Sequence, residues 1–133
     1  MIYRVVFLFC IFSIFPITLY SQHSNIYKGV AVIELFTSQG DINSPPADKL
    51  LSEIIADAEK NNKPVYCLSM HVDFWNRYGW KDPFSRFKYT TRLTNYTSVL
   101  GLKETYTPFM LLNGRTVLPS PDKNKVTSVI SGE

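Results

Sequence analysis

The sequence predicts an α/β domain in which helices cover both faces of a mixed four-stranded sheet. Residues 30–36 form a nearly continuous apolar run, which is typical of a strand buried on both faces of a sheet. Residues 47–58 then repeat apolar side chains at helical spacing. Asn113-Gly114 lies between two further apolar runs and is a strong short-range signal of a β-hairpin. A helix after a buried strand and a later hairpin together indicate a mixed sheet.

The first half of the sequence predicts a parallel crossover unit. The expected elements are a strand, a helix and a second strand, at residues 30–36, 45 to about 60, and 64–70. Ser44 followed by Pro45 is typical of a helix N-cap and a proline in the first helical turn. Pro64 follows a polar break and begins the second strand. Two strands joined by a helix of this length run parallel and form a right-handed crossover.

The second half predicts a helix, a hairpin and a closing helix. An aromatic loop at residues 71–81 ends at Asp82-Pro83, which has the pattern of a second helix start. The apolar stripe expected on that helix, before Gly101 ends it, is Phe84, Phe87, Leu93, Tyr96 and Leu100. The closing helix is expected from residue 121 to about residue 130. This order of elements is that of the thioredoxin fold, with two parallel and two antiparallel strands and helices on both faces.

Length and composition describe one small globular domain. The chain has 133 residues with an apolar content of 45%, which is enough for one hydrophobic core. Its formal charge of +3 comes from basic residues that are scattered along the chain, so a nucleic acid partner is not expected. The domain is expected to occupy residues 23–133, with residues 23–29 as a flexible lead-in.

Residues 1–22 have the pattern of a cleaved secretory signal peptide. A lone arginine precedes an apolar run at residues 5–15, and a proline and a polar exit follow. A membrane anchor is the alternative, but polar residues and a proline interrupt the run that would have to cross the bilayer. We therefore expect a secreted or periplasmic protein that meets the membrane only through its leader before cleavage. Cleavage leaves Cys67 as the one cysteine, and its strand-like surroundings predict a thiol buried in the core.

Three blocks of unusual composition lie at residues 34–48, 69–84 and 106–114. They contain Glu-Leu-Phe-Thr-Ser-Gln-Gly, Ser-Met-His-Val-Asp-Phe-Trp and Tyr-Thr-Pro, respectively. In composition and order they resemble a secreted thioredoxin-like family, catalogued as domain-of-unknown-function family 1223 (DUF1223). The resemblance implies an exported thioredoxin-like fold without an established activity. Members of the family usually extend further, so the resemblance leaves open whether this domain is shortened at its C-terminus.

The resemblance places Asp41 and Ser44 where the family carries the two cysteines of a Cys-x-x-Cys motif. Thiol-disulfide exchange needs a thiolate at a helix N-terminus and a second thiol that resolves the mixed disulfide. Asp41 and Ser44 supply neither. We expect Asp41 to stabilise the turn and the helix start, and Ser44 to act as a plain N-cap. No cofactor and no metal are assigned to these degenerate redox positions.

Thr107 and Pro108 resemble the pair at which thioredoxin-like proteins have a cis-proline facing the active-site helix. The resemblance implies backbone groups that pair with an extended substrate. A peptide-binding edge can therefore survive the loss of the cysteines, with strand addition beside Pro108 as its mode of binding.

His71 and Asp73 follow the second predicted strand, and Asp41 follows the first. Because ligands gather at the carboxyl ends of parallel strands, these three side chains can share one edge of the sheet. They could bind a divalent metal, or Asp73 could orient His71 as an acid or base. The simpler interpretation, which we favour, is that they hold the aromatic loop in place by hydrogen bonds.

Trp75, Trp80 and Lys81 complete the candidate pocket, with Phe74 and Tyr78 beside them. Large rings in such a loop either line a ligand groove or fasten the loop onto the core, and the second use is the commoner one.

The sequence therefore favours an exported thioredoxin-fold protein without a redox dithiol that binds an extended peptide or an exported protein. The alternative is an enzyme, either a relative of thiol-disulfide oxidoreductases or a metal-assisted enzyme that uses Asp41, His71 and Asp73. A shortened relative without activity is a third interpretation.

Overall fold

A computed structural model of the chain describes residues 29–118 and 122–131. The expected signal peptide and nearly all of the expected lead-in lie outside this part of the chain. In chain order, the described elements are β1 (Ala31–Thr37), α2 (Pro45–Lys60), β2 (Val65–His71), the 3₁₀ helix η2 (Phe74–Tyr78), α3 (Phe87–Val99), β3 (Phe109–Leu112), β4 (Thr116–Leu118) and α4 (Lys123–Ser131).

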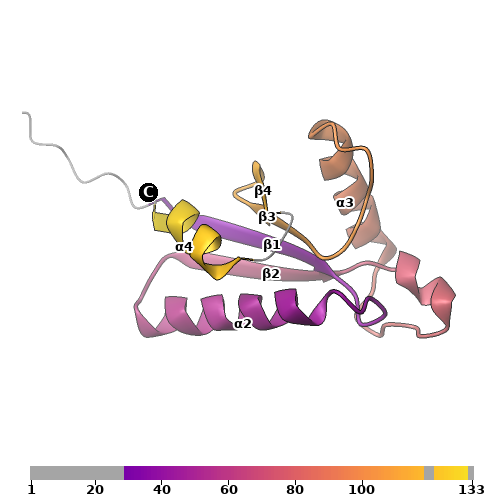
Figure 1. The fold of residues 1–133 in the computed structure, drawn as a ribbon, viewed down its shortest axis with the longest axis horizontal. Helices are drawn as coiled ribbons and strands as arrows, with labels where there is room; N and C mark the ends of the chain where they lie inside the picture. The colour runs from indigo at the N-terminus through magenta and orange to yellow at the C-terminus, as the bar shows by residue number, and fades with distance from the viewer. Residues whose placement is uncertain (1–28, 119–121, 132–133) are drawn as a thin grey trace, which may run out of the picture.

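The strands form one mixed sheet with the order β2, β1, β3, β4 (Figure 1). β1 pairs in parallel with β2 and antiparallel with β3, and β3 pairs antiparallel with β4. Leu35 lies beside Ser69 in the register on one side and beside Met110 on the other. The mixed four-stranded sheet predicted from the sequence is therefore confirmed.

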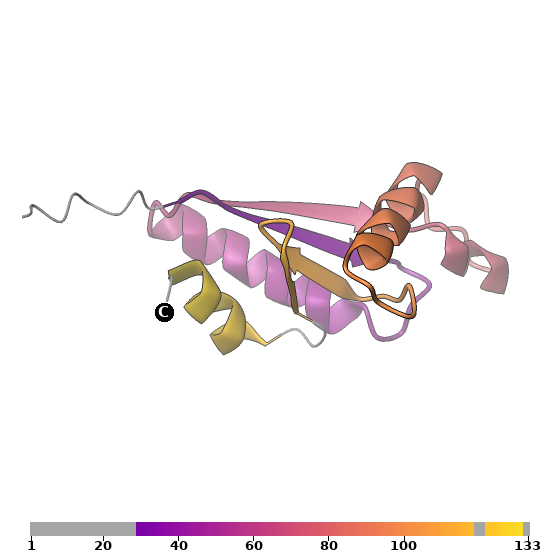
Figure 2. The same ribbon diagram turned by 90° about the horizontal axis from the view of Figure 1, so that it is seen from above.

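Helices cover both faces of this sheet (Figures 1 and 2). α2 and α4 pack on one face, where the core contains Ile33, Leu35, Leu50, Leu51, Ile54, Met110, Leu112 and Val126. α3 packs on the opposite face, where the core contains Phe36, Met70, Val72, Leu93, Phe109 and Leu111. Because successive strand residues point to opposite faces, Leu35 joins the first cluster and Phe36 joins the second.

α2 and the hairpin form where the sequence predicts them. α2 begins at Pro45 and ends at Lys60, and its buried residues recur at helical spacing. Asn113 and Gly114 have φ angles of 50° and 66°, which a tight hairpin turn requires and which Asn and Gly tolerate. Asn113 also fixes the turn to β1, because its backbone N–H donates to the Val32 carbonyl and its side-chain oxygen accepts from the Val32 N–H, both at 2.8 Å.

α3 begins later than the sequence predicts. It starts at Phe87, and Asp82-Pro83 does not form its first turn. The Asp82 carboxylate instead accepts the backbone N–H groups of Gln39 at 2.8 Å and Phe84 at 2.9 Å. Asp82 therefore closes the turn at Phe84 and binds the loop between β1 and α2 at Gln39. α3 begins only after this turn.

The apolar stripe predicted for this helix is wrong at its beginning. Phe84 and Phe87 are 60% and 74% exposed, whereas Leu93 is fully buried and Tyr96 packs against it. Phe87 is the first residue of α3 and lies outside the core, although its spacing fits the stripe.

Glu34 is a buried carboxylate under α3. Arg92 donates to its two oxygens at 2.7 and 2.9 Å, and the Tyr96 hydroxyl donates at 2.8 Å. Burial opposes ionisation of Glu34, but these hydrogen bonds and the charge of Arg92 outweigh it and lower the pKa of Glu34. The ion pair between Arg92 and Glu34 therefore holds α3 over β1, whose other residues apart from Thr37 are apolar.

β2 is an edge strand, and α3 covers only its carboxyl end. Tyr66 and Leu68 on the α3 face of β2 are 61% and 46% exposed. Cys67 on the other face is half-buried beside α2, so the prediction of a fully buried thiol is wrong, although burial raises the pKa of Cys67. Within the described ranges, none of the helices has the length and apolar character needed to cross a membrane.

Candidate functional site

The loop between β1 and α2 closes around the side chain of Asp41, which is 1% exposed. One carboxylate oxygen accepts the backbone N–H of Asn43 at 2.9 Å. The other accepts the Ser44 hydroxyl at 3.0 Å and the Thr107 hydroxyl at 2.5 Å. Asp41 thus stabilises the turn before α2, as expected, and also binds a residue that lies 66 positions further along the chain.

Thr107 joins this loop to the aromatic segment. Its hydroxyl donates to Asp41 and accepts the indole N–H of Trp75 at 2.7 Å. The Thr107–Pro108 peptide bond is cis. We call Asp41, Ser44, Thr107 and Trp75 the carboxylate network, because one chain of hydrogen bonds links them. The network brings together the start of α2, η2 and the segment before β3.

Ser44 lies at the N-cap position of α2 but does not cap it with its side chain. Its hydroxyl donates to Asp41 instead, and its backbone carbonyl accepts from Ala47 and Asp48 at 2.9 and 3.1 Å. The expectation of a plain N-cap is therefore corrected. The Ser44 oxygen accepts the backbone N–H of Ser38 at 3.4 Å, so the hydroxyl joins the loop before α2 and not the amides of the first helical turn.

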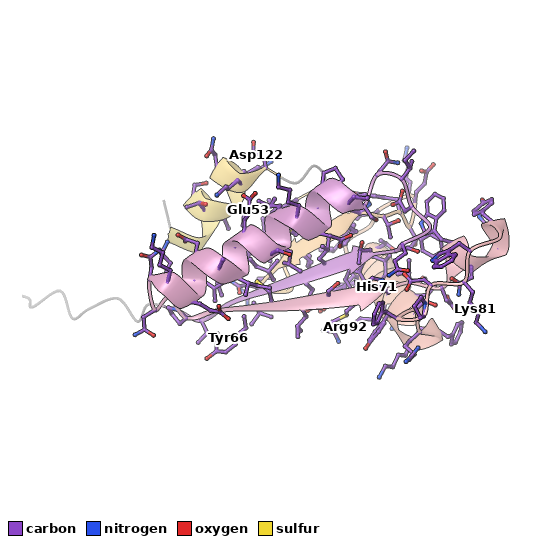
Figure 3. The ribbon with its side chains drawn as sticks, turned by 90° about the horizontal axis from the view of Figure 1, so that it is seen from below. Glu53, Tyr66, His71, Lys81, Arg92 and Asp122 are labelled. Carbon is purple, nitrogen blue, oxygen red and sulfur yellow. The ribbon has the colours of Figure 1, made fainter. Side chains whose placement is uncertain are left out.

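His71 is paired with Asp82, at the carboxyl end of β2 (Figure 3). The His71 Nδ1 and the Asp82 carboxylate are 2.6 Å apart, and the Asp82 side chain is fully buried. Burial opposes ionisation of Asp82, but hydrogen bonds from Gln39, His71 and Phe84 outweigh it and lower the pKa of Asp82. Since the ionised carboxylate can only accept, Nδ1 of His71 carries a proton and Nε2 is left for another partner.

Asp73 has a different role from the one considered for it. Its carboxylate accepts the Thr90 hydroxyl at 2.6 Å, and its backbone N–H donates to the same hydroxyl oxygen at 3.0 Å. Asp73 therefore fixes the start of η2 to α3, and Asp82, not Asp73, orients His71. These bonds agree with the interpretation that His71 and Asp73 hold the aromatic loop.

The structure does not assemble Asp41, His71 and Asp73 into one site. Each of the three has its own side-chain partner, namely Thr107, Asp82 and Thr90. In the part of the chain that the structure describes, no group of three His, Cys, Asp or Glu side chains is placed to hold a metal ion.

The aromatic loop contains one packed and one exposed tryptophan. Trp75 is partly buried and approaches Gly40 so closely that a Cβ at residue 40 would lie 3.1 Å from the Trp75 Cβ. Trp80 is 59% exposed, and its indole N–H donates to the Gln39 side chain at 3.1 Å. Lys81 lies on the outer side of the same loop (Figure 3). Trp75 thus serves the packing, whereas Trp80 and Lys81 form part of the surface.

An open pocket among the described residues lies elsewhere. It has a volume of about 350 Å³ and opens between the last turns of α2 and the edge of β2, where Ile55, Ala58, Glu59, Asn62, Lys63, Val65, Tyr66 and Cys67 line it. Cys67 and the carboxylate network therefore lie toward opposite ends of α2, about 20 Å apart at 1.5 Å per helical residue.

Sequence reasoning missed Asp82 as a site residue. Its place before Pro83 has the local pattern of a helix cap, and nothing local indicates that it binds His71 and Gln39. The carboxylate network was missed for the same reason, because its central bond joins residues that are distant in sequence.

Comparison with known proteins identifies a family and a related structure. The family model described as "protein of unknown function (DUF1223)" matches residues 32–133. A crystal structure of a protein from Agrobacterium tumefaciens, solved as a structural genomics target, is similar with 37% sequence identity and a TM-score of 0.68. The similarity covers 77% of this chain but only 44% of that protein, so the chain spans less than half of its length. A search among curated proteins finds no match.

Proposed function

Because the chain belongs to the DUF1223 family, whose description assigns no activity, we propose a function from the site itself. The protein is a thioredoxin-like peptide-binding module without a redox dithiol, and it binds an extended segment of an exported protein beside Pro108. The observation that carries the proposal is the backbone before Pro108. Residues 103–107 lie outside the helices and strands, and their backbone groups make no hydrogen bond to the backbone of another described residue.

This free backbone is held in place by side chains. The Thr107 hydroxyl is fixed between Asp41 and Trp75, and the Thr105 hydroxyl lies 3.0 Å from that of Thr97. The unpaired N–H and C=O groups of residues 103–107 thus belong to a segment that side chains hold in place, and residues 103–105 of it are exposed. An extended peptide can pair with such groups by strand addition. Because the segment of this protein is already ordered, binding costs it little conformational entropy.

The thioredoxin-like relationship that we propose points to the same location. It is supported by the mixed four-stranded sheet, by Asp41 and Ser44 at the start of α2, and by Thr107 and Pro108 just before β3. Asp41 and Ser44 are enclosed and hydrogen-bonded, and neither is a thiol. Binding without thiol exchange is therefore the function that we propose for this edge.

The proposal is tested by NMR titration with an unfolded polypeptide, such as reduced and carboxamidomethylated α-lactalbumin. We expect the amide signals of residues 103–107 to shift and those of β2, which is also an edge strand, to stay unchanged. Shifts along β2 with none at residues 103–107 would contradict the proposal.

Proline substitution makes the test sharper. In a paired strand, the N–H groups of alternate residues face the partner. We therefore compare Glu104→Pro with Thr105→Pro, and only one of these neighbouring changes should abolish binding. Equal effects of the two variants would argue against strand pairing. Thermal melts of both variants show whether each remains folded.

An enzyme remains the second proposal, and one observation favours it. The Asp82 carboxylate on Nδ1 of His71 is the arrangement by which a base is oriented in many hydrolases. Hydrolysis of p-nitrophenyl acetate by the parent and by His71→Gln tests it, because a general base at His71 gives a hydrolysis rate that disappears in the variant.

A further inference from the structure

Four aromatic side chains stand exposed between η2 and α3. Tyr78, Trp80, Phe84 and Phe87 are 65%, 59%, 60% and 74% exposed. We call residues 77–88 the aromatic tip. Folded proteins seldom expose several large rings within one short segment unless the surface has a binding role. In both ribbon views this part of the chain lies at the end of the molecule that is far from α4 (Figures 1 and 2).

The aromatic tip is also positively charged. Arg77, Lys81, Arg86 and Lys88 are all exposed. The tip contains one acidic residue, Asp82, whose side chain is buried and paired with His71. The ion pairs among the described residues use Lys63, His71, Arg92 and Lys123, so the four cations of the tip are not neutralised by them. The exposed charge of the tip is therefore about +4.

We propose that the aromatic tip docks on the surface of an anionic lipid bilayer. Tryptophan, tyrosine and phenylalanine side chains favour the depth of the lipid headgroups, and neighbouring lysine and arginine side chains attract anionic headgroups. The charge of the tip is complementary to such a surface. The rings and the cations lie in the same twelve-residue segment, so both kinds of contact can form at once.

The shape of the site favours a bilayer over an acidic peptide. The open pocket between the end of α2 and the edge of β2 includes no residue of the aromatic tip. A peptide that uses aromatic contacts would be expected to enter a groove, whereas a bilayer needs only a projecting surface. This inference does not depend on the peptide-binding proposal.

The experiment uses the full chain and its own tryptophans. Trp75 and Trp80 are the two tryptophans of the sequence, and both lie at or beside the tip. The protein is mixed with vesicles of phosphatidylglycerol and phosphatidylcholine, with and without brominated lipids that quench nearby indoles. We expect binding at least tenfold tighter than to pure phosphatidylcholine, quenching of Trp80, and a large loss of affinity in 0.5 M salt.

A matched pair of variants separates the tip from the rest of the surface. Phe87→Ser with Lys88→Glu changes the tip, and Val99→Ser with Lys125→Glu likewise replaces one exposed apolar side chain by serine and one exposed lysine by glutamate elsewhere. The first should weaken vesicle binding at least tenfold, and the second should change it less than twofold. Equal effects would overturn the proposal, provided that both variants melt like the parent.

Two other results would also overturn the proposal. Attachment through the apolar run at residues 5–15 alone would hold the protein on vesicles without quenching Trp80. Binding to a polyglutamate peptide without binding to anionic vesicles would assign the tip to an acidic protein partner instead.

Discussion

The carboxylate network should make a measurable contribution to stability, and Thr107→Val tests it with little change of shape. The substitution removes the hydroxyl that donates to Asp41 and accepts from Trp75. Loss of a hydrogen bond to a charged group costs about 1.5–3 kcal/mol, and loss of the neutral bond to the indole costs about 1 kcal/mol. Valine fills nearly the same volume, so no cavity is added. We expect unfolding to become easier by about 3 kcal/mol.

The assay is urea unfolding followed by tryptophan fluorescence. In a parallel thermal melt, the expected loss lowers the Tm of a domain of about this size by about 12–15 °C. Thr105→Val is the control, because Thr105 is exposed and its hydroxyl pairs only with Thr97, so its loss should cost about 0.5 kcal/mol.

A double-mutant cycle with Trp75→Phe completes the test. Since Trp75 and Thr107 share a hydrogen bond, their effects should not be additive. A loss below about 1 kcal/mol for Thr107→Val, or a loss equal to that of Thr105→Val, would refute the reasoning.

Three further predictions concern single contacts. Gly40→Ala should destabilise the fold by about 1–2 kcal/mol because its Cβ would crowd Trp75, while Gly29→Ala, which meets no atom within 4 Å, should be neutral in the same thermal melt. Arg92→Met should lower the free energy of unfolding by about 2 kcal/mol, because it leaves the buried Glu34 carboxylate without its cation. The expected loss is modest because the Arg92 side chain is 47% exposed, and Arg92→Lys should recover part of it in urea unfolding. Hydrogen bonds from Gln39, His71 and Phe84 hold the pKa of Asp82 below its ordinary value of 3.8, so the stabilisation from its ionised form should be present above about pH 4 and lost as the pH falls through the lower folded value. In Asp82→Asn this acid-sensitive part should be absent from a plot of urea midpoint against pH, and an unchanged slope would contradict the lowered pKa of Asp82.

The parts of the fold that depend on neighbouring residues could be predicted from the sequence. α2 is specified by the spacing of its apolar residues and by Pro45 at its start, and both ends fall where the pattern places them. The hairpin is specified by Asn113 and Gly114, whose backbone angles other residues adopt less easily. The mixed sheet follows from these two elements and from the buried run of β1.

The start of α3 and the candidate site depend on contacts between distant residues. Asp82 has the local pattern of a helix cap, but its carboxylate is drawn to an amide 43 positions away and to His71, which lies on a strand end. Ser44 has the pattern of an N-cap, yet its hydroxyl donates to the buried carboxylate of Asp41. A local pattern shows which hydrogen bonds a side chain can make, and only the packed fold decides which of them form.

The most direct test of the account is disulfide reduction by an Asp41→Cys, Ser44→Cys variant in a Cys10→Ser, Cys67→Ser background. If the start of α2 is a thioredoxin-like site that lacks only its thiols, a cysteine at the helix N-terminus gains a lowered pKa and a second cysteine resolves the mixed disulfide. We expect the parent background to be inactive and the double-cysteine variant to reduce the disulfides of insulin. An inactive variant that still melts cooperatively would contradict the assignment of this site.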